Sequence, residues 1–145
     1  MKLTVNQSPD YSGTEITINC RQITPELQTI IDRIRLLDCS IKGRLNGEIF
    51  IVPADVILYF DSVDGRSFAY CDDACYEVEE SLSELEAQLH GLSFIRISKN
   101  TLVCLRALRS VKGLDFSRMQ ITLRNGEQLI VSRHYLKAFK EAFGL

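Results

Sequence analysis

The sequence predicts a mainly β protein with added helices, an α+β fold built on an elongated β-sheet core. Short runs that alternate apolar and polar residues follow one another from Ser40 onward, which is the period of half-buried strands. Two-residue turn signals separate these runs and favour the positive φ angles of tight hairpins. With 145 residues, 46% of them apolar, the chain is long enough to bury one main core.

Three β-hairpins are expected around these turns. In chain order the turns are Asn46-Gly47, Asp64-Gly65 and Asn125-Gly126, and the hairpins cover residues 41–52, 56–71 and 117–131. The first and third turns match the type I′ signature, and the second matches it less cleanly. Further strands are expected over Phe94 to Ser98 and around Leu102 to Leu105.

An acidic segment at the front of the chain predicts one strand and one helix. Residues 15–20 alternate apolar and polar, which indicates a half-buried strand. Thr24 as N-cap and Pro25 at the first helical position predict a helix over 25–37. Its apolar stripe consists of Leu27, Ile30, Ile31, Ile34 and Leu37. We expect this stripe to pack on the β core or to form a homodimer contact, and we divide the chain into an accessory element, 1–42, and a main domain, 43–145.

Two further helices interrupt or follow the strands. Ser81 and Glu84 form a capping box before Leu82, Leu85 and Leu89, and Gly91 ends that helix. The last helix is expected to begin near Ser132 as N-cap. Its inward residues are Tyr135, Leu136, Phe139 and Phe143, and its outward ones Lys137 and Lys140.

Charge is divided unevenly along the chain. Residues 1–90 carry seven Lys and Arg against sixteen Asp and Glu, a net charge of −9, whereas residues 91–145 carry ten against three, a net charge of +7. A basic half attracts polyanions such as nucleic acid, although an ordinary solvated surface has the same composition.

The sequence gives little support to an enzyme, a metal site or a cofactor. It lacks the glycine-rich phosphate loops and the GxSxG nucleophile motif. The five cysteines are odd in number and scattered, which favours reduced thiols in the cytoplasm. Cys71 and Cys75 are spaced CxxxC without a second pair, so zinc is not expected. No secretory signal or apolar run of membrane-spanning length is found.

Four motifs in a fixed order resemble the LytTR DNA-binding domain, a family of bacterial regulators. They are Asp55 to Arg66, Leu82 to Leu89, Phe94 to Val103, and Leu123 to Lys137, and the resemblance runs from about Gly43 to the end of the chain. It implies an elongated arrangement of β-sheets that lays loops into the major groove of DNA, unlike helix-based readers.

The resemblance implies three DNA-contacting segments: the turn after the strand ending at Ser62, the basic loop of residues 96–100, and the end of the last strand. The candidate residues are Asp64, Arg66, Ser67, Arg96, Ser98, Lys99, Asn100, Ser132, Arg133, His134 and Lys137. The chemistry suits these positions, since Arg133 can fork to guanine and Lys99 can reach phosphates or base edges. Ser132 as N-cap would leave the first helical amides facing an anion. The ordinary alternative for Arg133 is an ion pair with Glu127 or Asp61.

The chain departs from the family pattern in two respects. Cys104 stands where the family often has asparagine, which puts one structural hydrogen bond in doubt. Only about 42 residues precede the domain, too few for the receiver domain of the family's response regulators. We therefore expect a stand-alone regulator without aspartyl phosphorylation. Such members are frequently encoded beside a membrane protein that restrains them, which makes a membrane-protein inhibitor a possible partner.

The sequence therefore predicts a cytoplasmic transcription regulator that binds double-stranded DNA at paired direct repeats as a homodimer, with no small-molecule substrate. The first alternative is a protein-interaction or ligand-sensing module whose basic face meets an acidic partner. The second is a small metal- or thiol-dependent enzyme that uses Cys71 and Cys75.

Overall fold

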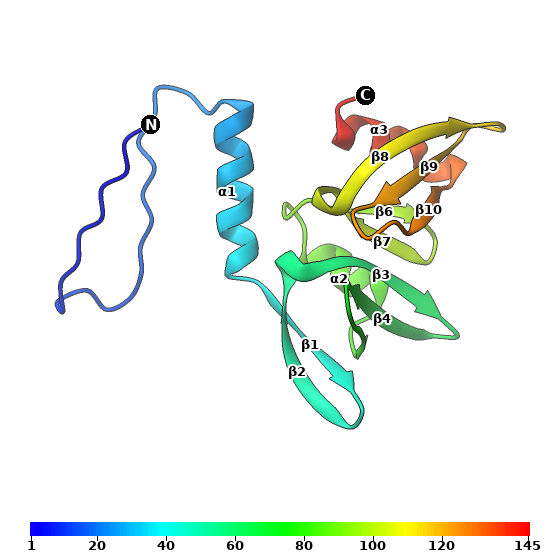
Figure 1. Cartoon of the computed structure of the whole chain (residues 1–145), viewed down its shortest axis with the longest axis horizontal. Coiled ribbons are helices and arrows are strands. Elements are labelled where there is room, and N and C mark those ends of the chain that lie inside the picture. Colours follow the sequence, from blue (N-terminus) through cyan, green and yellow to red (C-terminus); the bar gives the residue numbers. More distant parts are fainter.

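A computed structural model describes residues 1–145 and contains three α-helices and ten strands (Figure 1). The helices are α1 (Pro25–Leu37), α2 (Leu82–Gln88) and α3 (Leu136–Phe143). The strands are β1 (Ser40–Leu45), β2 (Glu48–Pro53), β3 (Ile57–Val63), β4 (Arg66–Cys71), β5 (Cys75–Val78), β6 (Phe94–Ser98), β7 (Thr101–Cys104), β8 (Leu108–Leu114), β9 (Arg118–Leu123) and β10 (Gln128–Val131). The mainly β fold with helices is confirmed.

The strands form two antiparallel sheets. The larger sheet has seven strands in the order β2-β1-β5-β4-β3-β7-β6, and the smaller has three in the order β10-β9-β8. Short 3₁₀ helices lie at Ala54–Val56, Leu105–Ala107 and Arg133–Tyr135. None of the α-helices has the length and hydrophobicity that a membrane span requires.

Three predicted hairpins are confirmed as β1–β2, β3–β4 and β9–β10. Asn46 and Asp64, with the glycine that follows each, have the positive φ angles that their turns require. The type I′ prediction for Asn125-Gly126 is wrong, because only Gly126 has a positive φ. The Gly126 amide donates to the Leu123 carbonyl over 2.9 Å, and the Asn125 side chain accepts from the Glu127 amide over 3.0 Å. This geometry is a tight turn followed by a left-handed glycine.

Two strands were not predicted from the sequence. β5 has only four residues in a segment rich in acids, yet it pairs with both β4 and β1. In β8 two exposed residues separate each partly buried residue from the next, so the strand lacks the one-to-one alternation that identifies a strand in a sequence. Both strands pair with the strand next to them in the chain, β5 with β4 and β8 with β9, so the pairing rather than their own residue pattern defines them.

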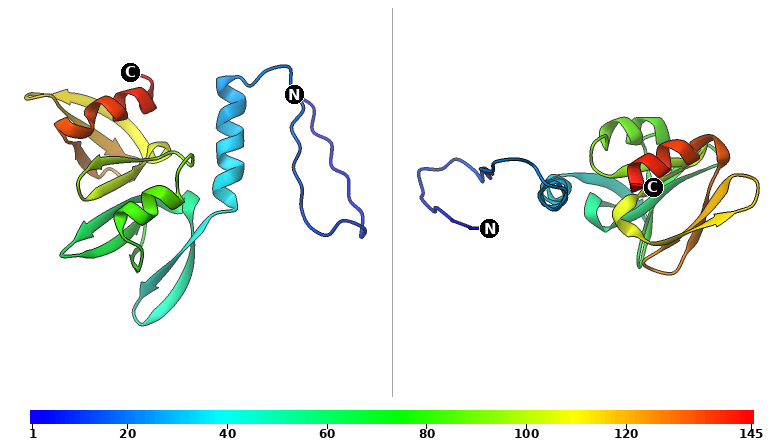
Figure 2. Two further views of the ribbon diagram at one scale, coloured as in Figure 1. Left: turned by 180° about the vertical axis from the view of Figure 1, so that it is seen from behind. Right: turned by 90° about the horizontal axis from the view of Figure 1, so that it is seen from above.

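The core has two clusters, one on each face of the seven-stranded sheet. One face packs against α2 and includes the fully buried Phe60 and Leu85. The other packs against the smaller sheet and α3, and it includes Ile97, Ile121 and Phe139. The sheet is therefore a central layer, and Figure 2 shows α2 and the smaller sheet with α3 as separate parts around it.

The predicted helix over residues 25–37 is confirmed as α1, with Thr24 accepting a hydrogen bond from the Leu27 amide over 3.2 Å. The expectation that its apolar stripe packs on the β core or forms a homodimer contact stays a prediction, since Leu27, Ile30, Ile31 and Ile34 are half-buried. Leu36 is the one buried residue of α1, and Leu37 is 69% exposed.

The strand predicted over residues 15–20 is also wrong, because these residues have no regular secondary structure. A strand needs a neighbouring strand to pair its backbone groups, and this segment has none within the chain. Ile16 and Ile18 are consequently exposed. Figure 1 shows residues 1–23 as an extended arm beside α1, on the side away from the sheets.

The other two helices follow the sequence more closely. α2 begins after Ser81, whose hydroxyl accepts from the Glu84 amide over 3.2 Å, as predicted. The last helix does not begin near Ser132: a 3₁₀ turn over Arg133–Tyr135 comes first, and the Ser132 side chain makes no capping hydrogen bond. Of its inward residues, Phe139 is fully buried and Phe143 is 38% exposed.

One glycine has a packing role that alanine cannot fill. A Cβ added at Gly43 in β1 would lie 2.5 Å from the Cβ of Tyr76, whereas one added at Gly113 in β8 would meet nothing within 4 Å. We expect Gly43→Ala to lower the free energy of unfolding by about 1–3 kcal/mol, because it overpacks the β1–β5 contact. Gly113→Ala is the matched control. Equal urea midpoints for the two variants would show that β1 and β5 do not approach this closely.

Candidate nucleic-acid interface

Backbone hydrogen bonds bring two of the three predicted DNA-contacting segments together. The Ser62 amide, near the end of β3, donates to the Asn100 carbonyl over 2.8 Å. The Thr101 hydroxyl donates to the Asp61 carboxylate over 3.0 Å. The β3–β4 turn and the β6–β7 turn therefore lie side by side at one end of the larger sheet.

The third segment is attached to the same place. The Ser132 amide, just after β10, donates to the Ile97 carbonyl over 2.9 Å. Ile97 lies in β6, one residue before the turn segment Ser98 to Asn100. The structure therefore joins residues 62, 97–100 and 132 through backbone contacts, although they are far apart in sequence.

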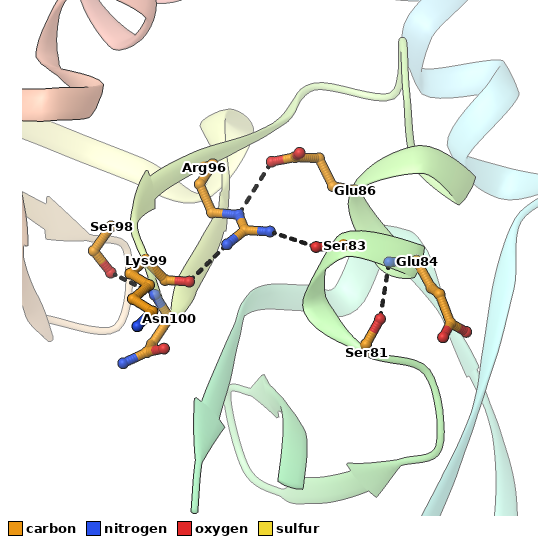
Figure 3. Close-up of polar contacts among 8 residues, drawn as sticks. All are labelled: Ser81, Ser83, Glu84, Glu86, Arg96, Ser98, Lys99 and Asn100. Carbon is orange, nitrogen blue, oxygen red and sulfur yellow. Dashed lines mark hydrogen bonds and ion pairs between the residues drawn. The ribbon is translucent and has the colours of Figure 1, made fainter. Parts of the chain in front are cut away.

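Arg96 does not present a free guanidinium, since it binds three groups of the chain (Figure 3). Its Nη1 donates to the Lys99 carbonyl over 2.6 Å, and its Nε donates to Glu86 over 3.1 Å. Its Nη2 donates to the Ser83 hydroxyl over 3.4 Å. The Arg96 side chain is only 16% exposed. The guanidinium thus ties the β6–β7 turn to α2.

The β6–β7 turn itself leaves its polar tips in solvent. Lys99 and Asn100 are exposed, and Figure 3 shows both side chains directed away from α2. The half-buried Ser98 hydroxyl accepts from the Asn100 amide over 3.3 Å, which stabilises the turn. The geometry suits contacts by Lys99 and Asn100 to groups outside the chain.

Arg66 is also engaged within the chain. Its Nε and Nη2 donate to the two carboxylate oxygens of Glu77 over 2.9 and 2.6 Å. This bidentate pair lowers the pKa of Glu77 and raises that of Arg66. Ser67 is buried, so the exposed Asp64 at the turn is the part of this segment that is open to a ligand.

Three cations near this end are free of ion pairs. The ion pairs of the structure use Arg44, Arg66, Arg96, Arg106 and Arg124. Lys99, Arg133 and Lys137 are exposed and belong to none of them. His134 is exposed beside Arg133. The free charges can therefore attract an anion without first breaking a contact within the protein.

The two carboxylates that could have neutralised Arg133 are occupied elsewhere. Glu127 accepts hydrogen bonds from the Tyr59 hydroxyl over 2.7 Å and from Asn125 over 3.1 Å. Asp61 accepts from Thr101. Burial and the hydrogen bond to Glu127 raise the pKa of Tyr59, so its proton stays in place. The ion pair that was the alternative reading of Arg133 does not form.

The thiol chemistry of the alternative enzyme reading is unfavourable. Burial raises the pKa of Cys71 to about 11, and nearby Asp73 and Asp72 act in the same direction. Burial also raises the pKa of Cys75. The thiolate is the reactive and metal-binding form, and these surroundings oppose it near neutral pH.

Sequence reasoning missed the partners that hold two of the candidate arginines. Glu77 and Glu86 lie ten or eleven positions from the arginines that they bind. No local motif relates the residues of either pair, since the contacts join β4 to β5 and β6 to α2.

Comparison with known proteins identifies the fold and the family. The model of the LytTr DNA-binding domain matches residues 47–144, and the chain therefore belongs to this family. The LytTr DNA-binding domain of a methyl-accepting/DNA response regulator from Bacillus cereus has a similar structure, with a TM-score of 0.70 and 22% sequence identity. The match covers 73% of this chain and 97% of that one.

Two kinds of relatives differ in how much of them the chain covers. The sensory transduction protein LytT of Enterococcus faecalis is 28% identical over 96 residues, which are 66% of this chain and only 39% of LytT. An uncharacterized HTH-type transcriptional regulator of Staphylococcus aureus is 26% identical over 147 residues, covering 100% of this chain and 99% of that protein. The chain thus spans about two fifths of LytT and nearly all of the second relative.

Proposed function

We propose that this chain is a cytoplasmic, sequence-specific regulator of transcription that binds double-stranded DNA at paired direct repeats as a homodimer. Its DNA-binding unit is residues 43–145, and residues 1–42 are an accessory element. One observation carries the proposal. Backbone hydrogen bonds join the β3–β4 turn, the β6–β7 turn and the start of the last helical segment, and Lys99, Asn100 and Arg133 remain exposed there.

Each exposed group has a distinct expected role on DNA. Arg133 can donate two parallel hydrogen bonds to the O6 and N7 atoms of guanine in the major groove. Lys99 and Lys137 are suited to phosphates, and Asn100 to the edge of adenine. Asp64 carries a negative charge, so it fits the amino group of cytosine rather than a phosphate. A membrane protein that restrains the regulator is a further proposed partner.

The proposal is tested by selecting bound duplexes from a random library with the purified chain. We expect the enriched sequences to contain two similar half-sites in the same orientation, spaced near one helical turn. Binding to one random duplex as tight as to the selected sites would overturn sequence-specific recognition. If the purified chain selects no duplex but retains an acidic protein in a pulldown, the interaction-module alternative is favoured.

Salt dependence gives a second test. Lys99 and Lys137 on each of two copies can neutralise about four phosphates, so log K should fall with log salt with a slope of about −4. Lys99→Ala should make that slope less steep by about 1 for each copy bound. A binding constant that does not change with salt would contradict phosphate contact.

Arg96 is expected to act on DNA binding by positioning the β6–β7 turn. We expect Arg96→Ala to weaken specific binding by about tenfold, because the turn loses the hydrogen bond to the Lys99 carbonyl. The salt slope should stay as in the unaltered protein, since the guanidinium is held by Glu86 and Ser83. Arg96→Lys keeps the charge but cannot span the three acceptors, so it should also bind weakly. A slope reduced as in Lys99→Ala would mean that Arg96 reaches a phosphate itself.

A further inference from the structure

α1 contacts the β core through only one of its sides. The Arg106 side chain donates to the Thr29 carbonyl over 3.0 Å and lies 3.8 Å from the Asp32 carboxylate. Leu36, one turn further on, is 1% exposed. Thr29, Asp32 and Leu36 follow one another at three- and four-residue spacing, so they define the side of α1 that faces the protein.

A second, apolar side of α1 faces elsewhere. We call Leu27, Ile30, Ile34 and Leu37 the seam residues. At 100° per residue, the seam lies roughly 150° around the helix from the side that contacts the core. Leu27, Ile30 and Ile34 are half-buried and Leu37 is 69% exposed. The right-hand view of Figure 2, which looks along α1, shows the sheets on one side of the helix and the extended arm on the other.

The spacing of the seam residues is that of a two-helix interface. Intervals of three, four and three residues place them at alternating a and d positions of a heptad repeat. Ile23 precedes the N-cap Thr24 and is therefore outside the helix, but it is 59% exposed and adds an apolar side chain next to the start of α1. The positions that face away from such an interface hold Thr29, Asp32 and Leu36, which are the residues that contact the core.

The charges that flank the seam fit a second copy of the same helix. In this register Arg33 occupies position g and Asp38 the following position e, which meet across a parallel pair of helices. Both residues are exposed, and neither makes an ion pair within the chain. Two copies would bring Arg33 of each next to Asp38 of the other.

We propose that α1 pairs in parallel with α1 of a second copy of this chain along the seam residues. This names the interface of the homodimer in the proposed function, and it rests on that function only for its use on DNA. Helices of about 20 Å are short for such a pair on their own. The arm adds apolar area on the same side of α1, through the exposed Leu3, Val5, Ile16 and Ile18.

Symmetry connects this dimer with the DNA. Two parallel copies of one helix are related by a two-fold axis, whereas direct repeats are related by a translation. Binding to two half-sites of the same orientation therefore requires at least one DNA-binding unit to turn about residues 38 and 39, which breaks the contacts of Thr29, Asp32 and Leu36 with the core in that copy.

The test is the mass of the full chain by sedimentation over a concentration series. We expect the unaltered protein to dimerise and Ile30→Ala with Ile34→Ala to be monomeric at the same concentrations. Alanine keeps the helix, as circular dichroism will verify. The matched control is Gln28→Ala with Arg35→Ala, two exposed neighbours outside the seam, which should remain dimeric.

Charge reversal tests the register. Arg33→Asp and Asp38→Arg should each weaken dimerisation by about tenfold, because each places like charges together twice, and the double variant should recover it. If the double variant dimerises more weakly by the sum of the two single effects, the parallel register is wrong.

Three outcomes would overturn the seam itself. They are an unaltered chain that stays monomeric, a dimer that tolerates both alanines, or a monomer whose melting temperature falls with both alanines because its own arm covers the seam. DNA binding provides a separate readout, since a monomer with an intact recognition surface still binds one half-site. An unaltered protein that dimerises but binds no DNA site specifically would therefore contradict the proposed function without contradicting the α1 interface.

Discussion

Replacing Arg133 by alanine is expected to weaken binding to the selected DNA site by about ten- to hundredfold. A fork of two hydrogen bonds to guanine is worth about 1–3 kcal/mol of discrimination, and alanine removes both donors. The loss should be large because Arg133 is exposed and has no partner within the chain to release. Fluorescence anisotropy with the selected duplex and with a random duplex measures the effect on each.

Two other substitutions separate charge from base recognition. Arg133→Lys keeps the positive charge without the planar fork, so it should retain phosphate attraction and lose preference for the selected site. Arg109→Ala is the matched control, because Arg109 is an exposed arginine on β8, the strand of the smaller sheet that is farthest from β10. Equal losses of Arg133→Ala on selected and random duplexes would show that the residue provides charge alone.

The largest expected effect on stability comes from Phe60→Ala. Phe60 is fully buried in the cluster between α2 and the larger sheet, and its ring lies 5.7 Å from that of Phe94. Truncation removes apolar burial and leaves a cavity, which together cost about 3–5 kcal/mol. That is a large fraction of the stability of a domain of this size, so urea unfolding should show a strongly lowered midpoint or an unfolded chain.

Phe116 provides the comparison for that variant. It is 82% exposed, with a positive φ angle, in the turn between β8 and β9. Phe116→Ala should change the free energy of unfolding by no more than about 0.5 kcal/mol. A similar loss in both variants would contradict the burial that the structure assigns to Phe60.

Features with local causes were predictable from the sequence. The glycines of the first two hairpins lie in turns whose positive φ angles few other residues adopt, and Thr24 and Ser81 cap the helices that they were predicted to begin. The third hairpin was placed correctly, but its turn type was not. There, the Asn125 side chain holds the Glu127 amide, an arrangement that the same dipeptide permits equally well.

Features that depend on a partner were not predictable. The apolar pattern of α1 identified a stripe, but hydrophobicity alone does not say whether a stripe meets the core, and the fully buried residue of α1 is Leu36, which lies outside the stripe. The candidate site shows the same limit. Its segments came from the order of motifs, whereas the internal contacts of Arg66 and Arg96 depend on β5 and α2, whose positions no single segment encodes.

The hydrogen bonds from Ser62 to Asn100 and from Ser132 to Ile97 have a consequence for how new specificities could arise. Both bonds join main-chain atoms, so they persist whatever side chains occupy positions 99, 100 and 133. The distance between these contacting positions therefore stays constant, while the bases that their side chains recognise can change. Libraries that randomise only these three positions should therefore yield proteins with altered base preference and an unaltered distance between the contacted bases within each half-site.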